Sequence, residues 1–429
     1  MLSTTDSTPL QQSAALSFLK PVLMIAFHFP PSTATGARRP FRFARYLRNY
    51  GYLLHVITQV PQSPPSPWEH TTEAPGSSHI PKRAAIGSKA AKILQRFLPY
   101  NDQLPWVAHA VEAATHLVAS QRPVAIISTS PPIACHLAAW LCSRWYGLPW
   151  IADFRDPLYG NPSRNRSWGW IWDAPIDRLV ISKAAAVIAN TDAAADMLRT
   201  RYPRMSHKIH LVWNGYDPEQ IIEPLPLPER SYRLLVHAGS LYGQRHPTAL
   251  FASLHRLITS GKVDPAQVRV KLVGEFYEND RWITESKFSE LVRLGCVEHT
   301  GAVTANEAVR EMAESDYLLL LDLNDRGIGL QVPAKIFEYV RIGRPILAFT
   351  GRNSPVERIL RQSGIRHICL HGDSPAEEID QQLLSLLAFP ATPLKPSIWF
   401  EEQFNGAKQS EALARILDEI LRCSPVNSY

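Results

Sequence analysis

One short stretch of the sequence combines a cation, a carboxylate and a helix start, which together suit a phosphorylated sugar. Residues 329–349 read GLQVPAKIFEYVRIGRPILAF. Pro333 stands where a helix can begin, apolar residues follow at helical spacing, and Gly343 ends the run. The unpaired N–H groups at a helix start suit a phosphate, Lys335 adds positive charge, and Glu338 can accept from a sugar hydroxyl. This chemistry predicts a sugar-nucleotide site.

A second polar group follows a predicted strand in the first half of the chain. The segment LPWIADFRDPLYG places Asp153, Arg155 and Asp156 at the carboxyl end of a parallel strand, where open α/β sheets bind ligands. The alternative is an Asp–Arg pair that only fixes a loop. Earlier in the chain, Arg38 begins a run of arginines on one helix face, where an anionic acceptor can bind. A solvated basic face is the alternative there.

The elements that position these residues alternate between buried strands and helices. An unbroken apolar run at 21–27 and largely apolar runs at 53–58 and 124–129 predict parallel strands, with helices at 40–51 and 133–146 between or after them. The same alternation returns after the proline-rich segment IIEPLPLPERSYR. We therefore predict an α/β protein with two Rossmann-like domains. The expected boundaries are a disordered leader at 1–20, a first domain at 21–216, a linker at 217–232, a second domain at 233–395 and a final helical segment at 396–429.

Composition limits the class of protein. A chain of 429 residues with 45% hydrophobic content is long enough for two cores. Its five cysteines are scattered without a C-x-x-C pair, which argues against a zinc site or a disulfide frame and favours a reducing compartment. The net charge of +6 favours anionic partners, but charge alone does not identify which anionic partner binds. The basic, amphipathic segment 82–98 fits either a membrane-surface helix or an ordinary packed helix.

The stretch 329–349 resembles the retaining glycosyltransferases of family 4, and Pro333 to Tyr339 resembles the branch that reads P-x-K-x-x-E-Y. The resemblance implies the GT-B architecture, in which the two Rossmann-like domains face a cleft and the last helix crosses back to the first domain. In that family two glutamates straddle such a helix. Glu338 matches the second, which contacts the nucleotide ribose, whereas Leu330 stands where the first, a donor-sugar contact, would be.

The same resemblance assigns further site residues. It implies that Gly36 lies near the donor phosphates and that the Thr300 to Val303 loop contacts the base. It also implies that a glycine loop and a following basic residue hold the diphosphate together with Lys335; these residues are Gly239, Ser240 and Arg245. The DFRDP pattern resembles a branch acting in polysaccharide assembly. This implies an acceptor-side role for Asp156 and Asp153, next to Arg38.

The resulting hypothesis is a retaining, metal-independent glycosyltransferase of the hexosyltransferase type. It would move a sugar from a nucleotide-diphosphate donor to a glycan or lipid-linked acceptor in surface polysaccharide or glycolipid synthesis. The chain contains no D-x-D triplet, and two cations beside the diphosphate can replace a metal, so we expect no metal and no cofactor. We expect no nucleic-acid partner, and a cytoplasmic location with peripheral contact to the inner face of the membrane. A catalytically silent binding protein and a sugar-nucleotide epimerase are the alternatives.

Overall fold

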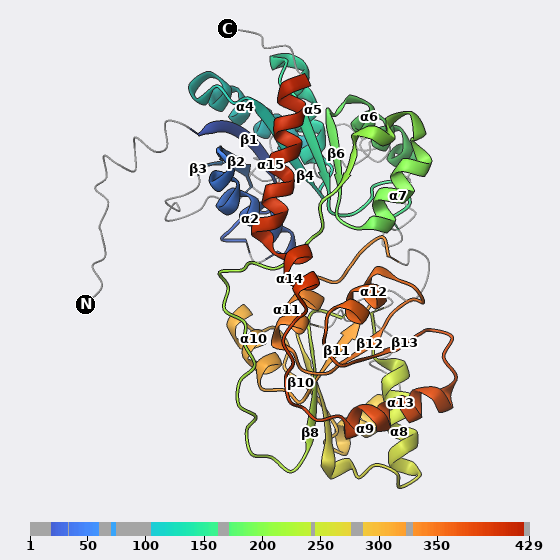
Figure 1. Ribbon diagram of the computed structural model, residues 1–429. Helices are drawn as coiled ribbons and strands as arrows, with labels where there is room; N and C mark the ends of the chain where they lie inside the picture. The colour runs from blue at the N-terminus through green and yellow to red at the C-terminus, as the bar shows by residue number, and fades with distance from the viewer. Residues whose placement is uncertain are drawn as a thin grey trace, which may run out of the picture. The chain divides into compact units, whose positions relative to one another are not determined.

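Apolar runs in both halves of the chain form parallel strands whose two faces are covered by helices (Figure 1). The computed structural model describes residues 19–32, 34–59, 70–73, 104–161, 171–241, 245–275, 286–322 and 329–423. The predicted leader, apart from its last two residues, and the basic segment 82–98 lie outside this range. The chain divides into unit 1, residues 1–217 and 406–429, and unit 2, residues 218–405.

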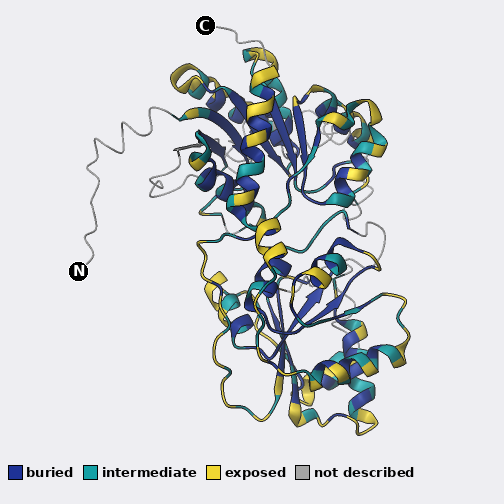
Figure 2. Ribbon diagram, in the orientation of Figure 1, coloured by how far each residue is buried: buried dark blue, intermediate teal, exposed yellow. Residues whose placement is uncertain are grey.

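Unit 1 contains one parallel sheet, and its strand order in the described part of the chain is β3-β2-β1-β4-β5-β6-β7. Val22 and Met24 on β1 pack into a core shared with the last helix, while Leu23 and Ile25 alternate to the opposite face and are equally buried. Figure 2 shows the sheet strands mostly in the dark blue of buried residues. The strands are β1 Lys20–Ala26, β2 Tyr52–Thr58, β3 His70–Glu73, β4 Ala125–Ser130, β5 Trp150–Phe154, β6 Ala186–Ala189 and β7 Ile209–Leu211. The helices are α2 Arg38–Tyr46, α4 Leu104–Gln121, α5 Ala134–Tyr146, α6 Asp173–Lys183, α7 Asp192–Arg201 and α15 Gly406–Cys423.

Unit 2 repeats the plan with the described strand order β10-β9-β8-β11-β12-β13, again all parallel. The strands are β8 Arg233–Ala238, β9 Val268–Val273, β10 Val297–His299, β11 Tyr317–Leu321, β12 Ile346–Phe349 and β13 His367–Leu370. The helices are α8 Thr248–Thr259, α9 Ser286–Arg293, α10 Ala305–Ala313, α11 Lys335–Ile342, α12 Pro355–Gln362, α13 Ala376–Ala388 and α14 Ile398–Phe404. The predicted fold class, α/β with two Rossmann-like domains, is confirmed.

The segment that joins the units packs on unit 2. Residues 218–232 form no helix or strand, and prolines at four positions remove backbone donors that a strand would need. Leu225 instead donates its N–H to the Ala313 carbonyl at 3.1 Å, and Arg344 donates to the Leu225 carbonyl at 2.6 Å. Unit 2 therefore begins at Pro218 rather than at residue 233.

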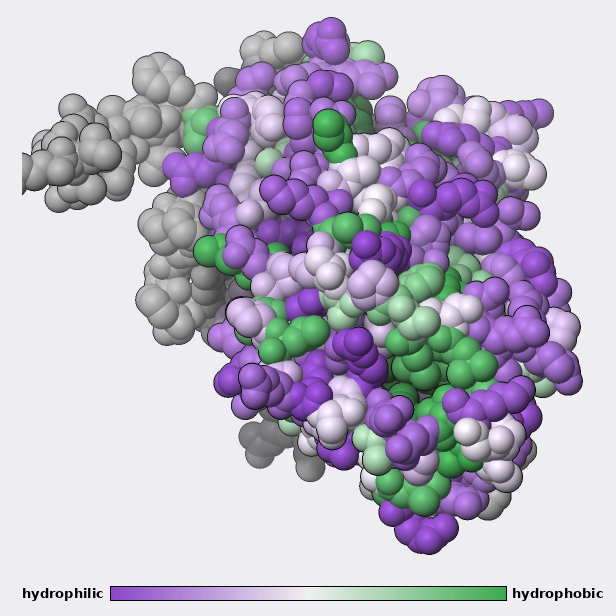
Figure 3. Space-filling model, turned by 60° about the horizontal axis from the view of Figure 1, so that its bottom comes forward, coloured by the Kyte–Doolittle hydropathy of each residue, from purple (hydrophilic) through white to green (hydrophobic). Residues whose placement is uncertain are grey.

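The last helix belongs to unit 1. α15 packs against α2 and the 3-10 turn Leu47–Tyr50, and its apolar face, including Leu413 and Leu417, completes the unit 1 core. The return begins at Gly406, so α14 stays with unit 2, where Phe400 and Phe404 stack near Phe337. Hydrophobic side chains also reach the surface, and Figure 3 shows them in patches between hydrophilic ones on the face it presents.

Candidate functional site

The Lys335 and Glu338 side chains form an ion pair at the start of α11. Their Nζ and Oε2 atoms are 2.7 Å apart, and only 5% of the Glu338 side chain is exposed. The pair is one helical turn apart, so both side chains lie on one face. Pro333 precedes the helix, and Gly343, with φ of 77°, ends it as the sequence predicted. The predicted cation and carboxylate therefore lie together.

Tyr339 fixes this helix against the sheet. Its hydroxyl accepts the Ala238 N–H at 2.9 Å and donates to the Leu319 carbonyl at 3.2 Å, which links α11 to β8 and β11. Burial raises the pKa of the phenol, so Tyr339 keeps its proton. α11 therefore stands at the carboxyl end of the two central strands, which is where parallel sheets bind ligands.

Three glycine loops meet at the same edge of the unit 2 sheet. Gly239 follows β8 and donates its N–H to the Val273 carbonyl at 2.8 Å, and Gly274 follows β9 and bridges to Gly301 after β10. A Cβ on Gly274 would lie 2.5 Å from the Gly239 carbonyl oxygen, so only glycine fits there. Ser240 and Val303 lie in these loops, one and two residues beyond Gly239 and Gly301.

His237 shows that the two predicted cations converge. Lys335 from α11 and Arg245 from the segment after β8 both act electrostatically on this buried ring. With burial as the larger cause, these two cations lower its pKa to about 4. Lys335 and Arg245 therefore both lie in the surroundings of His237 at the carboxyl edge of the unit 2 sheet, and their joint role with Glu338 in one donor site stays a prediction. The sequence interpretation missed His237, although a histidine within the apolar run LLVHA was a signal.

The residues of unit 1 that were predicted to lie on the acceptor side surround Arg155, which has a structural role. Its guanidinium donates to the carbonyls of Gly36, Pro131 and Ser130, so it joins the loops that follow β1, β4 and β5. A Cβ on Gly36 would lie 2.1 Å from Arg155 Nη1. The end of the Arg155 side chain is flexible and can move aside, so this contact alone does not require glycine at position 36. The expected phosphate contact of Gly36 stays a prediction.

Asp153 lies near the carboxyl end of β5, as the sequence predicted, and its arginine partner is Arg39. It lies inside β5, is fully buried, and its carboxylate accepts from Arg39 at 2.8–3.2 Å and from Thr129 at 2.9 Å. Arg39 also donates to the carbonyls of Val212 and Trp213. This geometry favours the alternative in which an Asp–Arg pair fixes a loop, although the arginine is Arg39 and not Arg155.

The arginines on α2 likewise hold in place the residues before Pro218, where the first segment of unit 1 ends. Arg42 donates to Asn214 Oδ1 at 2.5 Å, and Arg45 forms a 2.9 Å ion pair with Asp217. Burial lowers the pKa of Arg42 to about 9, with the Arg39 charge as a further cause. Neither Arg42 nor Arg45 forms the solvated basic face that was the alternative. Arg38 and Asp156 remain half-buried beside this network, at the carboxyl edge of the sheet.

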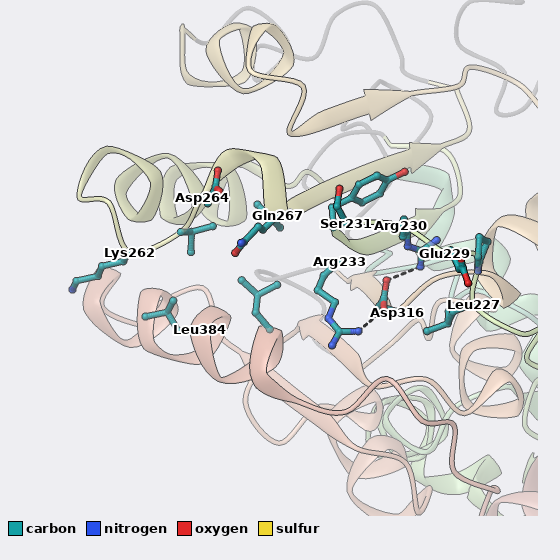
Figure 4. Close-up of a pocket in the computed structure, with 15 residues that line it drawn as sticks. Leu227, Glu229, Arg230, Ser231, Arg233, Lys262, Asp264, Gln267, Asp316 and Leu384 are labelled. Carbon is teal, nitrogen blue, oxygen red and sulfur yellow. Dashed lines mark hydrogen bonds and ion pairs between the residues drawn. The ribbon is translucent and has the colours of Figure 1, made fainter.

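A hollow of about 730 Å³ lies at the opposite, amino end of the unit 2 strands. Figure 4 shows Arg230 and Arg233 pointing at Asp316 within it. The Asp316 carboxylate accepts from both guanidinium groups, at 2.5 and 3.0 Å, and from the Leu234 N–H at 2.9 Å. The two arginines and Asp316 are already paired with one another, so we assign them a structural role at the start of β8 and β11.

Two observations bear on metals and membranes. Within the described ranges, no cluster of three or more histidine, cysteine, aspartate or glutamate side chains is placed to hold a metal ion. No helix in the same ranges is both long enough and apolar enough to cross a bilayer. Metal independence and membrane contact both stay predictions.

Residues 36–220 match the family model described as Glycosyltransferase Family 4. No curated protein matches the chain in sequence. Among solved structures, the chain is similar to the Anabaena protein HepE in complex with UDP and glucose, with a TM-score of 0.61 and 15% identity over 93% of this chain and 100% of that one.

Two further solved structures share the arrangement. Sucrose-phosphate synthase from Thermosynechococcus elongatus has a TM-score of 0.61 and 14% identity over 94% of this chain and 98% of that one. WaaG, a glycosyltransferase involved in lipopolysaccharide biosynthesis, has a TM-score of 0.56 and 13% identity over 95% of this chain and 100% of that one. At these identities the likeness concerns the fold, and the chain has the two-domain α/β fold of the GT-B glycosyltransferases.

Proposed function

We propose that this protein is a retaining glycosyltransferase that uses a nucleotide-diphosphate sugar. The observation that carries the proposal is the 2.7 Å pair of Lys335 and Glu338 at the start of α11, beside the buried His237 ring on which Arg245 also acts. The match of residues 36–220 to Glycosyltransferase Family 4 and the GT-B fold support the same reaction class.

Each group has a role in this proposal. Arg245 and Lys335 bind the diphosphate and stabilise the negative charge that grows on it as the sugar leaves. Glu338 accepts a hydrogen bond from the ribose, and the loops that carry Gly239, Ser240 and Val303 surround the nucleotide. The two fixed cations supply the charge that a metal ion would supply, so we propose a metal-independent reaction.

Retention of configuration would follow from attack on the same face of the sugar that the diphosphate leaves. The donor phosphate then accepts the proton of the acceptor hydroxyl, so no protein base is required. On the acceptor side we propose Arg38 and Asp156, which stand at the carboxyl edge of the unit 1 sheet. The acceptor class that we propose is a glycan or a lipid-linked sugar, in surface polysaccharide or glycolipid synthesis.

We further propose a cytoplasmic enzyme in peripheral contact with an anionic membrane. The net charge of +6 supports attraction to anionic headgroups. Binding to vesicles with and without phosphatidylserine tests this part separately from the chemistry.

The donor site is tested first by thermal shift with UDP, GDP, ADP and their sugars, because a ligand of the folded state raises the melting temperature. With the nucleotide sugar that binds, Lys335→Ala and Glu338→Gln should weaken binding or turnover at least about tenfold, which is a loss of about 1.4 kcal/mol. Lys271→Ala is the matched control, because it breaks another 2.7 Å Lys–Glu pair of unit 2, with Glu311 on α10. Unchanged kinetics in the Lys335 and Glu338 variants would overturn the site.

The products separate the remaining candidates. Transfer to an acceptor, or slow release of the nucleotide without one, supports the glycosyltransferase. Binding without release for every donor supports a catalytically silent protein, and conversion of the donor sugar alone, followed by NMR, supports an epimerase.

A further inference from the structure

His237 carries a buried nitrogen that the proposed donor site does not yet use. Its Nδ1 atom lies 3.0 Å from the Leu319 carbonyl oxygen on β11. A carbonyl only accepts, so Nδ1 carries the proton and the neutral ring keeps a lone pair on Nε2. Nε2 is buried and has no hydrogen-bond partner in the described part of the chain. A buried polar atom without a partner costs free energy, and a ligand that binds beside it is one explanation for such an atom.

The surroundings of this ring are positively charged. Lys335 on α11 and Arg245 after β8 disfavour the imidazolium, whereas the carbonyls of Leu319 and Gly239 favour it. A Cβ built on Gly239 would lie 3.5 Å from Nε2, so Nε2 is adjacent to the glycine loop of the proposed diphosphate site. Burial is the largest cause, and together with the two cations it outweighs the two carbonyls and lowers the pKa of His237 to about 4, so the ring is neutral near pH 7.

A bound diphosphate reverses this balance. Its negative charge would lie between Arg245 and Lys335 and would neutralise the two cations that oppose protonation. It would also stand close to the lone pair on Nε2, which an anion repels unless a proton lies between them. Protonation removes this repulsion and converts Nε2 from an unpartnered acceptor into a charged donor.

We propose that His237 takes up a proton when the diphosphate of a nucleotide sugar binds, and so becomes a third cation of the donor site. This inference rests on the proposed function of that site. The protonated ring stabilises the bound diphosphate and the charge that develops on it as the sugar leaves. Because the bound state then holds one more proton than the free state, affinity must rise as the pH falls from the pKa of the complex toward the lower pKa of the free ring.

Calorimetry with UDP-glucose tests the inference, because its diphosphate is a diester with no proton to exchange near neutral pH. The binding enthalpy is measured at pH 6 in two buffers that differ in ionisation enthalpy, and the difference gives the protons taken up. We expect uptake of about half a proton or more per ligand. As the pH rises from the pKa of the free ring, about 4, to the pKa of the complex, the affinity should fall by up to tenfold for each pH unit, and above the pKa of the complex it should stay constant.

Two variants complete the test. His237→Asn retains a donor for the Leu319 carbonyl but removes Nε2, so it should abolish proton uptake and flatten the pH dependence. His371→Asn is the control, because His371 makes the same type of Nδ1 contact, 3.1 Å to the Thr350 carbonyl, after β13. It should keep the uptake of the wild-type protein.

The outcomes distinguish this inference from the proposed function. Binding of UDP-glucose with no proton uptake, or uptake that persists in His237→Asn, would overturn the role of His237 and leave the donor site intact. Failure of UDP-glucose, GDP-mannose and ADP-glucose to bind would overturn the donor site itself, and the inference with it.

Discussion

Asp177 on α6 is a buried carboxyl group whose protonation makes the stability of the folded protein depend on pH. Its Oδ2 atom accepts from the Tyr202 hydroxyl at 2.8 Å and lies 3.7 Å from Arg201. Burial nevertheless outweighs these contacts and raises the pKa of the carboxyl to about 6. The folded protein therefore binds a proton at a pH where the unfolded chain does not.

Asp177→Asn should remove this pH dependence. For a carboxyl whose folded pKa is raised, folding gains stability as pH falls from above the folded pKa toward the unfolded one. Between pH 7 and pH 4.5 the wild-type protein should gain about 1–3 kcal/mol relative to the variant, because each pKa unit is worth about 1.4 kcal/mol. Urea unfolding at both pH values measures the difference. Asp196→Asn, at an exposed aspartate of α7, is the control, and an equal shift there would refute the assignment.

The sequence was least informative about contacts between single residues that are far apart along the chain. Lys335 and Glu338 are three positions apart, so helical spacing alone predicted their proximity. Arg39 and Asp153 are 114 positions apart, and no local pattern identifies such a pair. The pairing of Asp153 depends on the register of β5 beside β4 and on where α2 packs, which only the folded chain determines.

At the scale of elements, the loop, helix and strand around α11 followed from local signals. Gly343 ends the helix, Pro345 follows it, and the apolar run Ile346–Phe349 forms β12 as predicted. Each of these signals depends on residues that are close together in the sequence, so the sequence is sufficient to predict the helix end and the strand that follows. The sequence did not reveal that Leu394 packs against Gly343, where a Cβ would lie 2.1 Å from the Leu394 carbonyl oxygen.

Gly343→Ala should therefore destabilise unit 2 more than a left-handed backbone alone explains. Gly295 is the matched control, because it has φ of 72°, close to the 77° of Gly343, but no atom within 4 Å of its built Cβ. Gly295→Ala should cost about 1–2 kcal/mol, the penalty of the left-handed region. Gly343→Ala should cost at least about 2 kcal/mol more, because the Leu394 backbone must move. Chemical denaturation compares them, and equal costs would exclude the contact as the cause.

The whole molecule is organised by a chain that leaves unit 1 at Asp217, builds unit 2 and returns to unit 1 at Gly406. The alternation of strands and helices predicted two α/β domains, because that pattern repeats along the sequence. The return could not be derived from the amphipathic pattern of residues 406–423, because an ordinary terminal helix has the same pattern; it came from the family resemblance. Gln409 donates to the Asn214 carbonyl at 3.0 Å, which ties the returning helix to the end of the first segment.

Leu417→Ala should loosen unit 1 and leave unit 2 unchanged. Leu417 on α15 is fully buried in the unit 1 core, although it follows unit 2 in sequence. Removing its side chain leaves a cavity that typically costs about 2–5 kcal/mol. Hydrogen–deuterium exchange should quicken in β1 and β2, whose core residues it joins, and stay unchanged in β8 and β11. Glu419→Ala, at an exposed position two residues further on, should change neither unit, and faster exchange throughout unit 2 in Leu417→Ala would contradict this assignment of α15.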